Sequence, residues 1–340
     1  MTVIEVKTLK RIAATATLFW TVGLPCQTSA QLTKITTSYV SDSAGVLPLW
    51  IGKEAGLFAR NGLEVQAVRV HASVGVMALM SGELQFVQAS GPVVVESALR
   101  GSNAVYVACG MSTLDFVLLS RPEIKTAEQL KGTTVGLSAF RGANPAATRF
   151  ALQKLGLAPK DVSLIVVGGT TERIASLRLG KIQATLFSPP QNVVAQREGF
   201  NVLADVADLG LPFIHIGLAT TRSFVRDNPE TVRRYVKSHL EAIHLMKTDR
   251  ETGIKVLAKY LGQIKDPEIL AKTYDSAVPD NKFPRKQYPS IAGLQMALDL
   301  LAEENAKAKT AKPEDFIDLR FIKELDDSGY IDGLYKAKVK

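Results

Sequence analysis

The sequence predicts an α/β protein built from two similar lobes. Segments typical of strands alternate with segments typical of helices, which is the pattern of a parallel sheet covered by helices. The phrase SGELQFVQASGP at residues 81–92 has a counterpart, LGKIQATLFSPP, at residues 179–190. The chain of 340 residues is 46% hydrophobic and 22% charged, so it can bury a core, and its length suggests about two domains.

The two phrases agree at a leucine, a glycine, an apolar–glutamine pair, a serine and a proline. The matched residues, all at one spacing, are Leu79 and Leu177, Gly82 and Gly180, Leu84-Gln85 and Ile182-Gln183, Ser90 and Ser188, and Pro92 and Pro190. Agreement at a single spacing indicates one structural unit used in both halves. A further match, at a spacing one residue shorter, aligns Thr36-Thr37, Ser41 and Gly45 with Thr133-Thr134, Ser138 and Gly142.

The first half begins with a strand, a polar loop and a helix. The run from Ile35 to Val40 is rich in β-formers and precedes the loop Ser41-Asp42-Ser43-Ala44-Gly45. Apolar residues from Leu47 to Glu54 then follow helical spacing until Gly56 ends the pattern. The same reasoning predicts a strand at 63–70, a turn at 71–73, a helix at 74–80 and a strand at 86–89.

The second half repeats this succession from Lys131. A strand at 133–137 and a glycine-containing loop at 138–144 precede a helix at 145–155, for which Asn144 is the expected cap and Pro145 the first helical residue. A strand at 162–167, the loop Gly168-Gly169-Thr170-Thr171, a helix at 172–179 and a strand at 182–187 complete the unit.

The first thirty residues resemble a secretion leader. Lys7, Lys10 and Arg11 precede an apolar stretch from Ile12 to Pro25, and Thr28-Ser29-Ala30 offers the small residues that precede a cleavage site. We expect a signal peptide at residues 1–30, with cleavage after Ala30, and a periplasmic protein. A retained anchor is the alternative, but the stretch is short and rich in threonine for a membrane span.

Charge, cysteine content and the missing motifs narrow the function classes. The net charge is +8, and removing Lys7, Lys10, Arg11 and Glu5 takes away +2 and leaves +6 on mixed-sign helices, so no nucleic-acid partner is expected. Without the leader only Cys109 remains, which excludes an internal disulfide.

The sequence lacks the common catalytic and nucleotide-binding motifs: HExxH, GxSxG, GxxxxGK[ST] and a GxGxxG after a strand. We therefore expect no catalytic residues, no metal site and no cofactor. His239 and His244 are five residues apart and are expected at the surface.

Polar residues cluster in the loops that follow the predicted strands. In parallel α/β sheets ligands lie beyond the carboxyl ends of strands, where hydroxyls and helix N-termini accept polar solutes. Small polar residues also form ordinary turns, and that interpretation stays open for each one singly. For His71 and His215 a capping or hinge hydrogen bond is the alternative. The candidate ligand-binding residues are Ser41, Asp42, Ser43, His71, Ser73, Ser90, Ser112, Ser138, Phe140, Arg141, Asn144, Thr170, Ser188, Pro189 and His215.

Three stretches resemble a known family: WIGKEAGLFARNGLEV, VGGTTERIASLRLGKIQAT and LFSPP. They are similar to ABC-transporter solute-binding proteins of the nitrate, sulfonate and taurine type, a group that includes binders and makers of thiamine pyrimidine precursors (NMT1/THI5-like). The resemblance implies a type II periplasmic-binding-protein fold, with two α/β lobes, two crossover strands and a cleft. It also implies a monomer that captures a small organic anion, a sulfonate or carboxylate with an aromatic body as one option, and delivers it to a membrane permease.

Within that fold the lobes and crossovers can be assigned to residues. Lobe 1 is expected at 31–116 together with 221–340, including the C-terminal helices, and lobe 2 at 121–213. Strands at 117–120 and 214–220 are expected to carry the chain across. Beyond Ser223 the chain is mostly helical, with starts at Asn228-Pro229 and near Glu251, Pro267, Ile291 and Phe316.

Other functions on the same fold stay open. One alternative is a pyrimidine-precursor binder. A related alternative is a pyrimidine synthase of the THI5-like branch, which consumes a histidine and a bound pyridoxal phosphate, and His71 could be that histidine. The leader and the lack of a cysteine-rich run argue against the synthase. Another is a solute-sensing partner of a membrane receptor, which the sequence does not separate from a transport component.

The loop Ser138–Asn144 departs from the family, whose members commonly place glycine and small hydroxyl residues there. Arg141 could hold a carboxylate or sulfonate in two parallel hydrogen bonds, beside an apolar wall formed by Phe140. An outward-facing Arg141 would instead be a solvated rim charge.

Replacing Arg141 with alanine tests these alternatives. If the guanidinium holds the solute, the dissociation constant measured by calorimetry should rise at least about tenfold. An unchanged dissociation constant would identify Arg141 as a rim charge.

Overall fold

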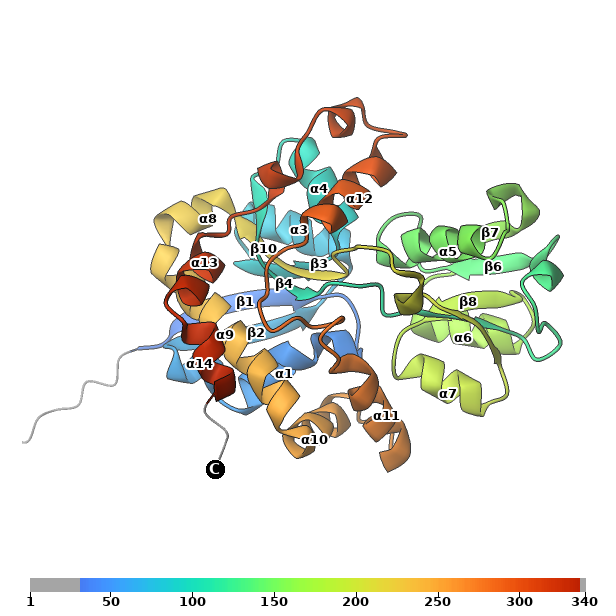
Figure 1. Cartoon of the computed structure of the whole chain (residues 1–340), viewed down its shortest axis with the longest axis horizontal. Coiled ribbons are helices and arrows are strands. Elements are labelled where there is room, and N and C mark those ends of the chain that lie inside the picture. The colour runs from blue at the N-terminus through green and yellow to red at the C-terminus, as the bar shows by residue number, and fades with distance from the viewer. Residues whose placement is uncertain (1–30, 337–340) are drawn as a thin grey trace, which may run out of the picture. The chain divides into compact units, whose positions relative to one another are not determined.

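Two five-stranded sheets organise the protein (Figure 1). The structure is a computed structural model that describes residues 31–336, and those from Leu32 onward form one compact unit. The strand order is β2-β1-β3-β10-β4 in the first sheet and β7-β6-β8-β5-β9 in the second. The expected signal peptide and its cleavage after Ala30 lie outside the described residues.

The first sheet contains three parallel strands and one antiparallel strand that arrives late in the chain. Strands β1 (Thr33–Tyr39), β2 (Leu63–Arg69) and β3 (Phe86–Ala89) run parallel. Strand β10 (Ile216–Thr221) lies antiparallel between β3 and β4 (Ala104–Met111). Every residue of β4 is buried, which explains its unbroken run of small and apolar side chains.

The second sheet repeats this plan. Strands β6 (Thr134–Leu137), β7 (Ser163–Val166) and β8 (Ala184–Phe187) run parallel. Here the antiparallel strand is β5 (Val117–Ser120), which lies between β8 and β9 (Asn201–Asp205) and precedes the parallel strands in the chain. The duplicated phrases therefore occupy equivalent places, since each contains the third parallel strand of its sheet.

The glutamine shared by the two phrases has the same role in each sheet. Gln85 Oε1 accepts a hydrogen bond from Thr36 N at 2.8 Å, and its backbone N donates to Thr36 O at 2.9 Å. Gln183 makes the same pair of bonds with Thr134, at 3.0 and 2.8 Å. These bonds align Thr36 with Thr134 and Gln85 with Gln183, so the spacing is the same as in the phrases. The one-residue-shorter match of Thr36-Thr37 to Thr133-Thr134 is therefore wrong.

The helices cover both sheets (Figure 1). A 3₁₀ turn at Ala44–Val46 precedes the first helix. The α-helices are α1 (Leu47–Glu54), α2 (Leu57–Arg60), α3 (Ala72–Ser81), α4 (Gly91–Leu99), α5 (Ala143–Lys154), α6 (Thr170–Arg178), α7 (Gln191–Arg197), α8 (Arg222–Asp227), α9 (Pro229–Thr248), α10 (Arg250–Tyr260), α11 (Pro267–Ala277), α12 (Ile291–Leu301), α13 (Arg320–Asp327) and α14 (Tyr330–Lys336).

Three helices of the two repeated units, α3, α5 and α6, begin two residues earlier than predicted, and α6 begins at Thr170. Helix α3 begins at Ala72 with His71 as its N-cap, so Ser73 lies in the helix and not in a turn. Helix α5 begins at Ala143 after Gly142, whose φ of 108° is favourable for glycine alone. Asn144 is therefore no cap. Its Oδ1 accepts from Ser138 N at 2.9 Å and its Nδ2 donates to Leu186 O at 3.4 Å, which joins the loop after β6 to β8.

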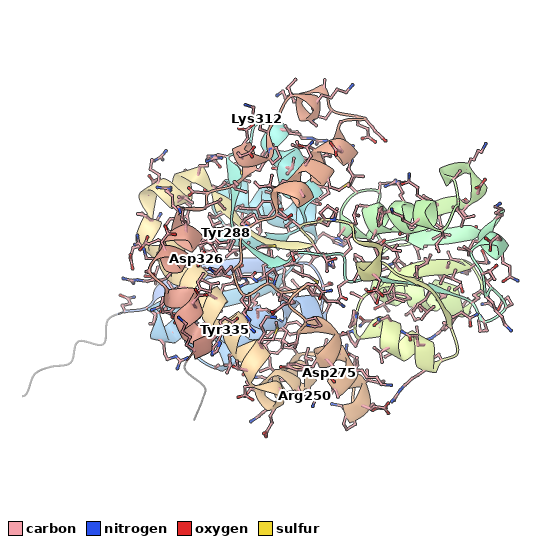
Figure 2. The ribbon with its side chains drawn as sticks, in the orientation of Figure 1. Arg250, Asp275, Tyr288, Lys312, Asp326 and Tyr335 are labelled. Atoms are coloured by element: carbon pink, nitrogen blue, oxygen red, sulfur yellow. The ribbon has the colours of Figure 1, made fainter. Side chains whose placement is uncertain are left out.

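The largest hydrophobic cluster packs the first sheet against α1 and the C-terminal helices. Trp50 of α1 stacks on Tyr260 of α10, with ring centroids 4.7 Å apart, and Tyr235 of α9 stacks on Phe86 of β3 at 4.0 Å. Between the helices, Arg250 pairs with Asp275 at 2.9 Å, and the Tyr288 hydroxyl donates to Asp326 at 3.0 Å (Figure 2). The C-terminal helices thus form part of the core of the first sheet.

His239 of α9 was expected at the surface and is buried. Its Nε2 lies 2.9 Å from the carbonyl oxygen of Cys109 in β4. The prediction failed because the wide apolar face of α9 includes the position of His239, where a backbone carbonyl satisfies the ring. His244, one turn further along, is half-buried and packs edge-on against Tyr335.

Within the described residues the chain passes between the sheets at 112–116 and at 206–215. Each strand proposed as a crossover is a member of one sheet, β5 of the second and β10 of the first. The lobe and crossover limits given above stay predictions. The two connections, together with the loop between α11 and α12, form a compact cluster that we call the hinge cluster: Asp115, His215 and Lys282.

The hinge cluster is held by a buried ion pair. Lys282 Nζ donates to Asp115 Oδ1, and both side chains are almost fully buried. Burial raises the pKa of Asp115, and the Lys282 ammonium opposes that rise. The backbone N of Asp115 donates to His215 Nδ1 at 3.3 Å, so the two connections also contact each other. Burial lowers the pKa of His215 to about 4, which keeps the ring neutral near pH 7.

Removing one partner of the ion pair should be costly. Lys282→Met leaves the Asp115 carboxylate buried without its counter-ion, so we expect the free energy of unfolding in urea to fall by about 3–5 kcal/mol. Adding Asp115→Asn should recover part of that loss. The control is Lys286→Met, since Lys286 lies in the same loop but pairs with Asp326 at a half-exposed position, and it should cost less than about 1 kcal/mol. Equal costs for Lys282→Met and Lys286→Met would contradict the assignment.

His215 should make stability depend on pH. Its pKa of about 4 in the folded state lies below the ordinary 6.5, so between these values the unfolded chain binds a proton that the folded chain does not. The contribution of His215 to the free energy of unfolding is therefore complete above pH 6.5 and is lost as the pH falls toward 4. Because Asn retains an acceptor for Asp115 N, His215→Asn should lose less stability than the parent between about pH 7 and about pH 4.5 in urea titrations. Identical losses in the two proteins would show that His215 does not carry the effect.

Candidate functional site

A cavity of about 1280 Å³ is lined by residues from both sheets. Helices α4 and α7, the two connections between the sheets and the segment before α11 form part of its wall. The rest is formed mainly by the segments that follow the parallel strands: 39–43 after β1, 69–73 after β2, 88–90 at β3, 138–144 after β6, 169–174 after β7 and Ser188 after β8. All are carboxyl ends of strands, which is where a ligand is expected in an α/β sheet. The repeated architecture therefore delivers equivalent loops from the two sheets to one space.

Most of the predicted site residues lie on this cavity. They are Ser41, Asp42, Ser43, His71, Ser73, Ser90, Ser138, Phe140, Arg141, Asn144, Thr170, Ser188 and His215. Phe140 is 71% exposed and lies at the rim rather than in an inner wall. Which of these residues touch a solute stays a prediction.

Ser112 and Pro189 do not line the cavity. Ser112 N donates to Lys282 O at 2.9 Å, and its hydroxyl faces the carbonyls of Asn281 and Lys282. Ser112 directly follows β4, and the loop between α11 and α12 covers it. Pro189 is buried, and its carbonyl accepts from Ala44 N at 3.3 Å. This bond joins the segment after β8 to the segment after β1.

Arg141 has carboxylate partners within the protein. Its Nη1 pairs with Glu96 of α4, and its Nη2 pairs with Glu304, which follows α12. Arg141 therefore links the loop after β6 to helices of the first sheet. A solute anion would have to compete with two carboxylates for this guanidinium, so the tenfold effect expected of Arg141→Ala stays a prediction.

A second arginine makes a similar link, and one of its partners, Asp266, lines the cavity. Arg197 of α7 pairs through its two Nη groups with Asp266 and Glu268 at the start of α11. Asp266 also caps α11, accepting from Glu268 N at 2.8 Å. Arg141 and Arg197, with their four carboxylates, form two ion-pair links between elements of the two sheets.

Arg173 differs from these two arginines. It belongs to α6, is 5% exposed, and forms no ion pair with a carboxylate in the part of the chain that the structure describes. Its Nε donates to Gly168 O at 3.2 Å, and its Nη1 donates to Thr185 Oγ1 at 3.2 Å and to Leu186 O. Its guanidinium lies 5.0 Å from the centre of the Phe187 ring. Burial lowers the pKa of Arg173 to about 10, so the group stays charged near pH 7.

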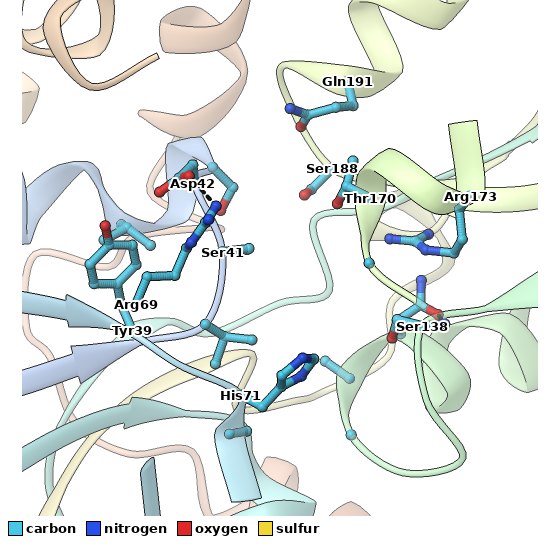
Figure 3. A pocket seen from close by; sticks show the side chains of 18 of the residues that line it. Tyr39, Ser41, Asp42, Arg69, His71, Ser138, Thr170, Arg173, Ser188 and Gln191 are labelled. Carbon is cyan, nitrogen blue, oxygen red and sulfur yellow. Dashed lines mark hydrogen bonds and ion pairs between the residues drawn. The ribbon is translucent and has the colours of Figure 1, made fainter. Parts of the chain in front are cut away.

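The side chains around Arg173 are mostly uncharged and polar. Figure 3 shows its guanidinium directed from α6 into the cavity, with Ser138, Thr170 and Ser188 on the same side. Helix α6 begins here at Thr170, and its N-cap Gly169 supplies no side-chain cap. The exposed carboxylate of Glu172 lies beside Gly169, and its attraction opposes the lowering of the pKa of Arg173.

The opposite wall comes from the first sheet (Figure 3). Arg69 pairs with Asp42 at 2.5 Å, and Tyr39 packs edge-on against Trp50. Burial and the nearby Asp42 carboxylate raise the pKa of Tyr39, so it is a neutral hydroxyl donor. This wall therefore presents hydroxyls, amides and a neutralised charge pair.

Sequence reasoning missed Arg173, Gln191, Tyr39 and Arg69 as cavity residues. Arg173 stood within the quoted stretch VGGTTERIASLRLGKIQAT, one turn into the helix after a Gly-Gly loop. Its position near a helix N-terminus could be read from the sequence, but its burial and its lack of a carboxylate partner could not. Tyr39 and Arg69 are the last residues of β1 and β2. At the end of a strand the alternation of apolar and polar residues does not indicate whether a side chain faces the cavity.

The residues that the structure describes contain neither a candidate metal centre nor a helix suited to span a membrane. No group of three or more His, Cys, Asp or Glu side chains is placed to hold a metal ion. None of the helices in 31–336 is long and apolar enough to cross a membrane.

Solved structures share the fold at low sequence identity. The alkanesulfonate-binding protein SsuA from Xanthomonas axonopodis pv. citri superposes with a TM-score of 0.69 and 18% identity, covering 86% of this chain and 100% of that chain. The nitrate-binding protein NrtA from Synechocystis PCC 6803 gives 0.72 and 13%, covering 87% and 89%. SsuA from Escherichia coli gives 0.67 and 19%, covering 85% and 92%. The predicted periplasmic-binding-protein fold of type II is confirmed.

Sequence comparisons give two further results. No curated protein sequence matches the chain. The family model described as "NMT1/THI5 like" matches residues 43–252, which is more than half of the 340 residues and includes every parallel strand of both sheets except β1. The chain belongs to the NMT1/THI5-like family.

Proposed function

We propose that this protein is the extracytoplasmic solute-binding component of an ABC importer. The observation that carries the proposal is the cavity, to which both sheets contribute the carboxyl ends of parallel strands. A space with polar walls from two sheets can enclose a small molecule and remove it from water. The expected leader at 1–30 and a periplasmic location belong to the same proposal, as does a permease partner for a monomeric binding protein.

The proposed solute is a small organic anion, a carboxylate or a sulfonate. A buried guanidinium without a carboxylate partner and several hydroxyls face the cavity. The structural relatives give further support, since one is described as alkanesulfonate-binding and bound to MOPS, and another as nitrate-binding. The volume of the cavity accommodates a solute larger than an inorganic ion, including one with an aromatic body.

Capture is proposed to occur by movement of the lobes about the two connections. Lobe 1 would comprise 31–116 and 221–340, lobe 2 would comprise 121–213, and the crossovers would lie near 117–120 and 214–220. The ion-pair links of Arg141 and Arg197 support this, because each joins elements of the two sheets, and Arg141 and Asp266 line the cavity. A solute that contacts both walls would favour the arrangement in which these links form.

The identity of the bound solute tests the proposal. Mass spectrometry of protein purified under native conditions should find a small carboxylate or sulfonate, and its addition to stripped protein should raise the melting temperature as ligand concentration rises. A pyrimidine would favour the precursor-binding alternative, and an absorbance band from bound pyridoxal phosphate would favour the synthase. If nothing is bound, and a broad panel of sulfonates, carboxylates, pyrimidines and nitrate produces no shift, the binding role is contradicted.

A further inference from the structure

The arginines that line the cavity differ in how their charge is balanced. Arg69, Arg141 and Arg178 each form an ion pair with a carboxylate of the protein. Arg173 is the most deeply buried of the four and has only backbone carbonyls and the Thr185 hydroxyl as acceptors among the described residues. A buried charge without a counter-ion is unfavourable unless another partner is supplied.

The hydrogen bonds of Arg173 fix the direction of its guanidinium. Nε and Nη1 are bound to the loop before α6 and to β8, so the plane of the group is held from two sides. Nη2 has no acceptor in the described part of the chain and belongs to a side chain that lines the cavity. A guanidinium whose orientation is already fixed loses little conformational entropy when it binds an oxyanion.

The surroundings of this group fit an oxyanion and not a second cation. The hydroxyls of Ser138, Thr170 and Ser188 face the same part of the cavity (Figure 3). Helix α6 starts at Thr170 with no side-chain cap, so its first backbone N–H groups add positive potential there. Glu172 is the nearest carboxylate, but it is exposed and forms no ion pair with Arg173.

We propose that Arg173 is the residue that recognises the anionic group of the solute. This proposal rests on the proposed function and specifies it: the carboxylate or sulfonate lies against the second sheet, between Arg173 and the hydroxyls of Ser138, Thr170 and Ser188. The body of the solute then extends toward Tyr39 and toward Phe116, a cavity residue whose ring packs against that of His215 with centroids 4.8 Å apart. Arg141 acts at the same cavity as a link between the two walls and does not select for charge.

The test compares each anion with its neutral isostere. The probes are benzoate with benzamide, benzenesulfonate with benzenesulfonamide, and hexanoate with hexanamide, measured by calorimetry on the full mature chain. The parent protein should bind at least one anion more tightly than its amide. Arg173→Gln should reduce that preference at least about tenfold. The carboxylate and sulfonate pairs show which of the two groups the site prefers.

Two matched variants separate recognition from structure. Arg141→Gln should change the affinities for anion and amide by the same factor, so the preference is retained. Glu172→Gln should preserve or increase the preference for the anion over its amide, since a competing negative charge is removed. Far-ultraviolet circular dichroism and the melting temperature without solute report whether each variant folds.

A second measurement tests the proposal on the parent protein, in case Arg173→Gln does not fold. In protein labelled with ¹⁵N-arginine, the side-chain signal of Arg173, identified with Arg173→Lys, should shift when benzoate or benzenesulfonate is added and not when the amide is added. A parent that binds anion and amide equally, or that binds no probe, overturns the proposal, as does an Arg173→Gln protein that keeps the preference. The proposed function is decided separately by the co-purified solute, so the two can fail independently.

Discussion

The rest of the structure depends on the antiparallel pairing of β10 and β5 with their neighbouring strands. Strand β10 belongs to the first sheet but follows all strands of the second sheet in the sequence. Strand β5 belongs to the second sheet and precedes the three parallel strands of that sheet in the sequence. Backbone hydrogen bonds from β10 to both β3 and β4 make the first sheet continuous. The chain passes between the sheets next to these strands, at 112–116 and at 206–215, and the carboxyl edges of the two parallel sets border one cavity. The two connections share the hinge cluster of Asp115, His215 and Lys282.

Electrostatics divides the arginines at and beside the cavity into two kinds. Arg141 and Arg197 are half-exposed and satisfied by carboxylates, so each contributes modestly to stability and mainly sets which elements of the two sheets approach one another. Arg173 is buried and held by neutral acceptors, so its charge is available to a solute. The hinge cluster is different again, because its buried charge is balanced within the protein by Lys282.

Much of the fold could be predicted because strand and helix periodicities depend on local burial. The duplicated phrases located the third parallel strand of each sheet, and Gly82 and Gly180 ended the preceding helices through their left-handed backbone. The candidate site was predicted less completely. Loop residues after strands were identified as a class, whereas Arg173 and Gln191 were missed, and Ser112 and Pro189 were included although other segments cover them.

The sequence by itself determined the architecture, the family and the strand ends at which polar residues gather, since these follow from local patterns of burial and turn chemistry. Only the tertiary structure decided which charges are paired. The partners of Arg141, Arg197 and Asp115 lie far away in the chain, at Glu304, Asp266 and Lys282. Whether a guanidinium is neutralised depends on which distant carboxylates the fold brings within contact, and no local spacing carries that information. This is why Arg141 attracted attention in the sequence, while Arg173 did so only in the folded protein.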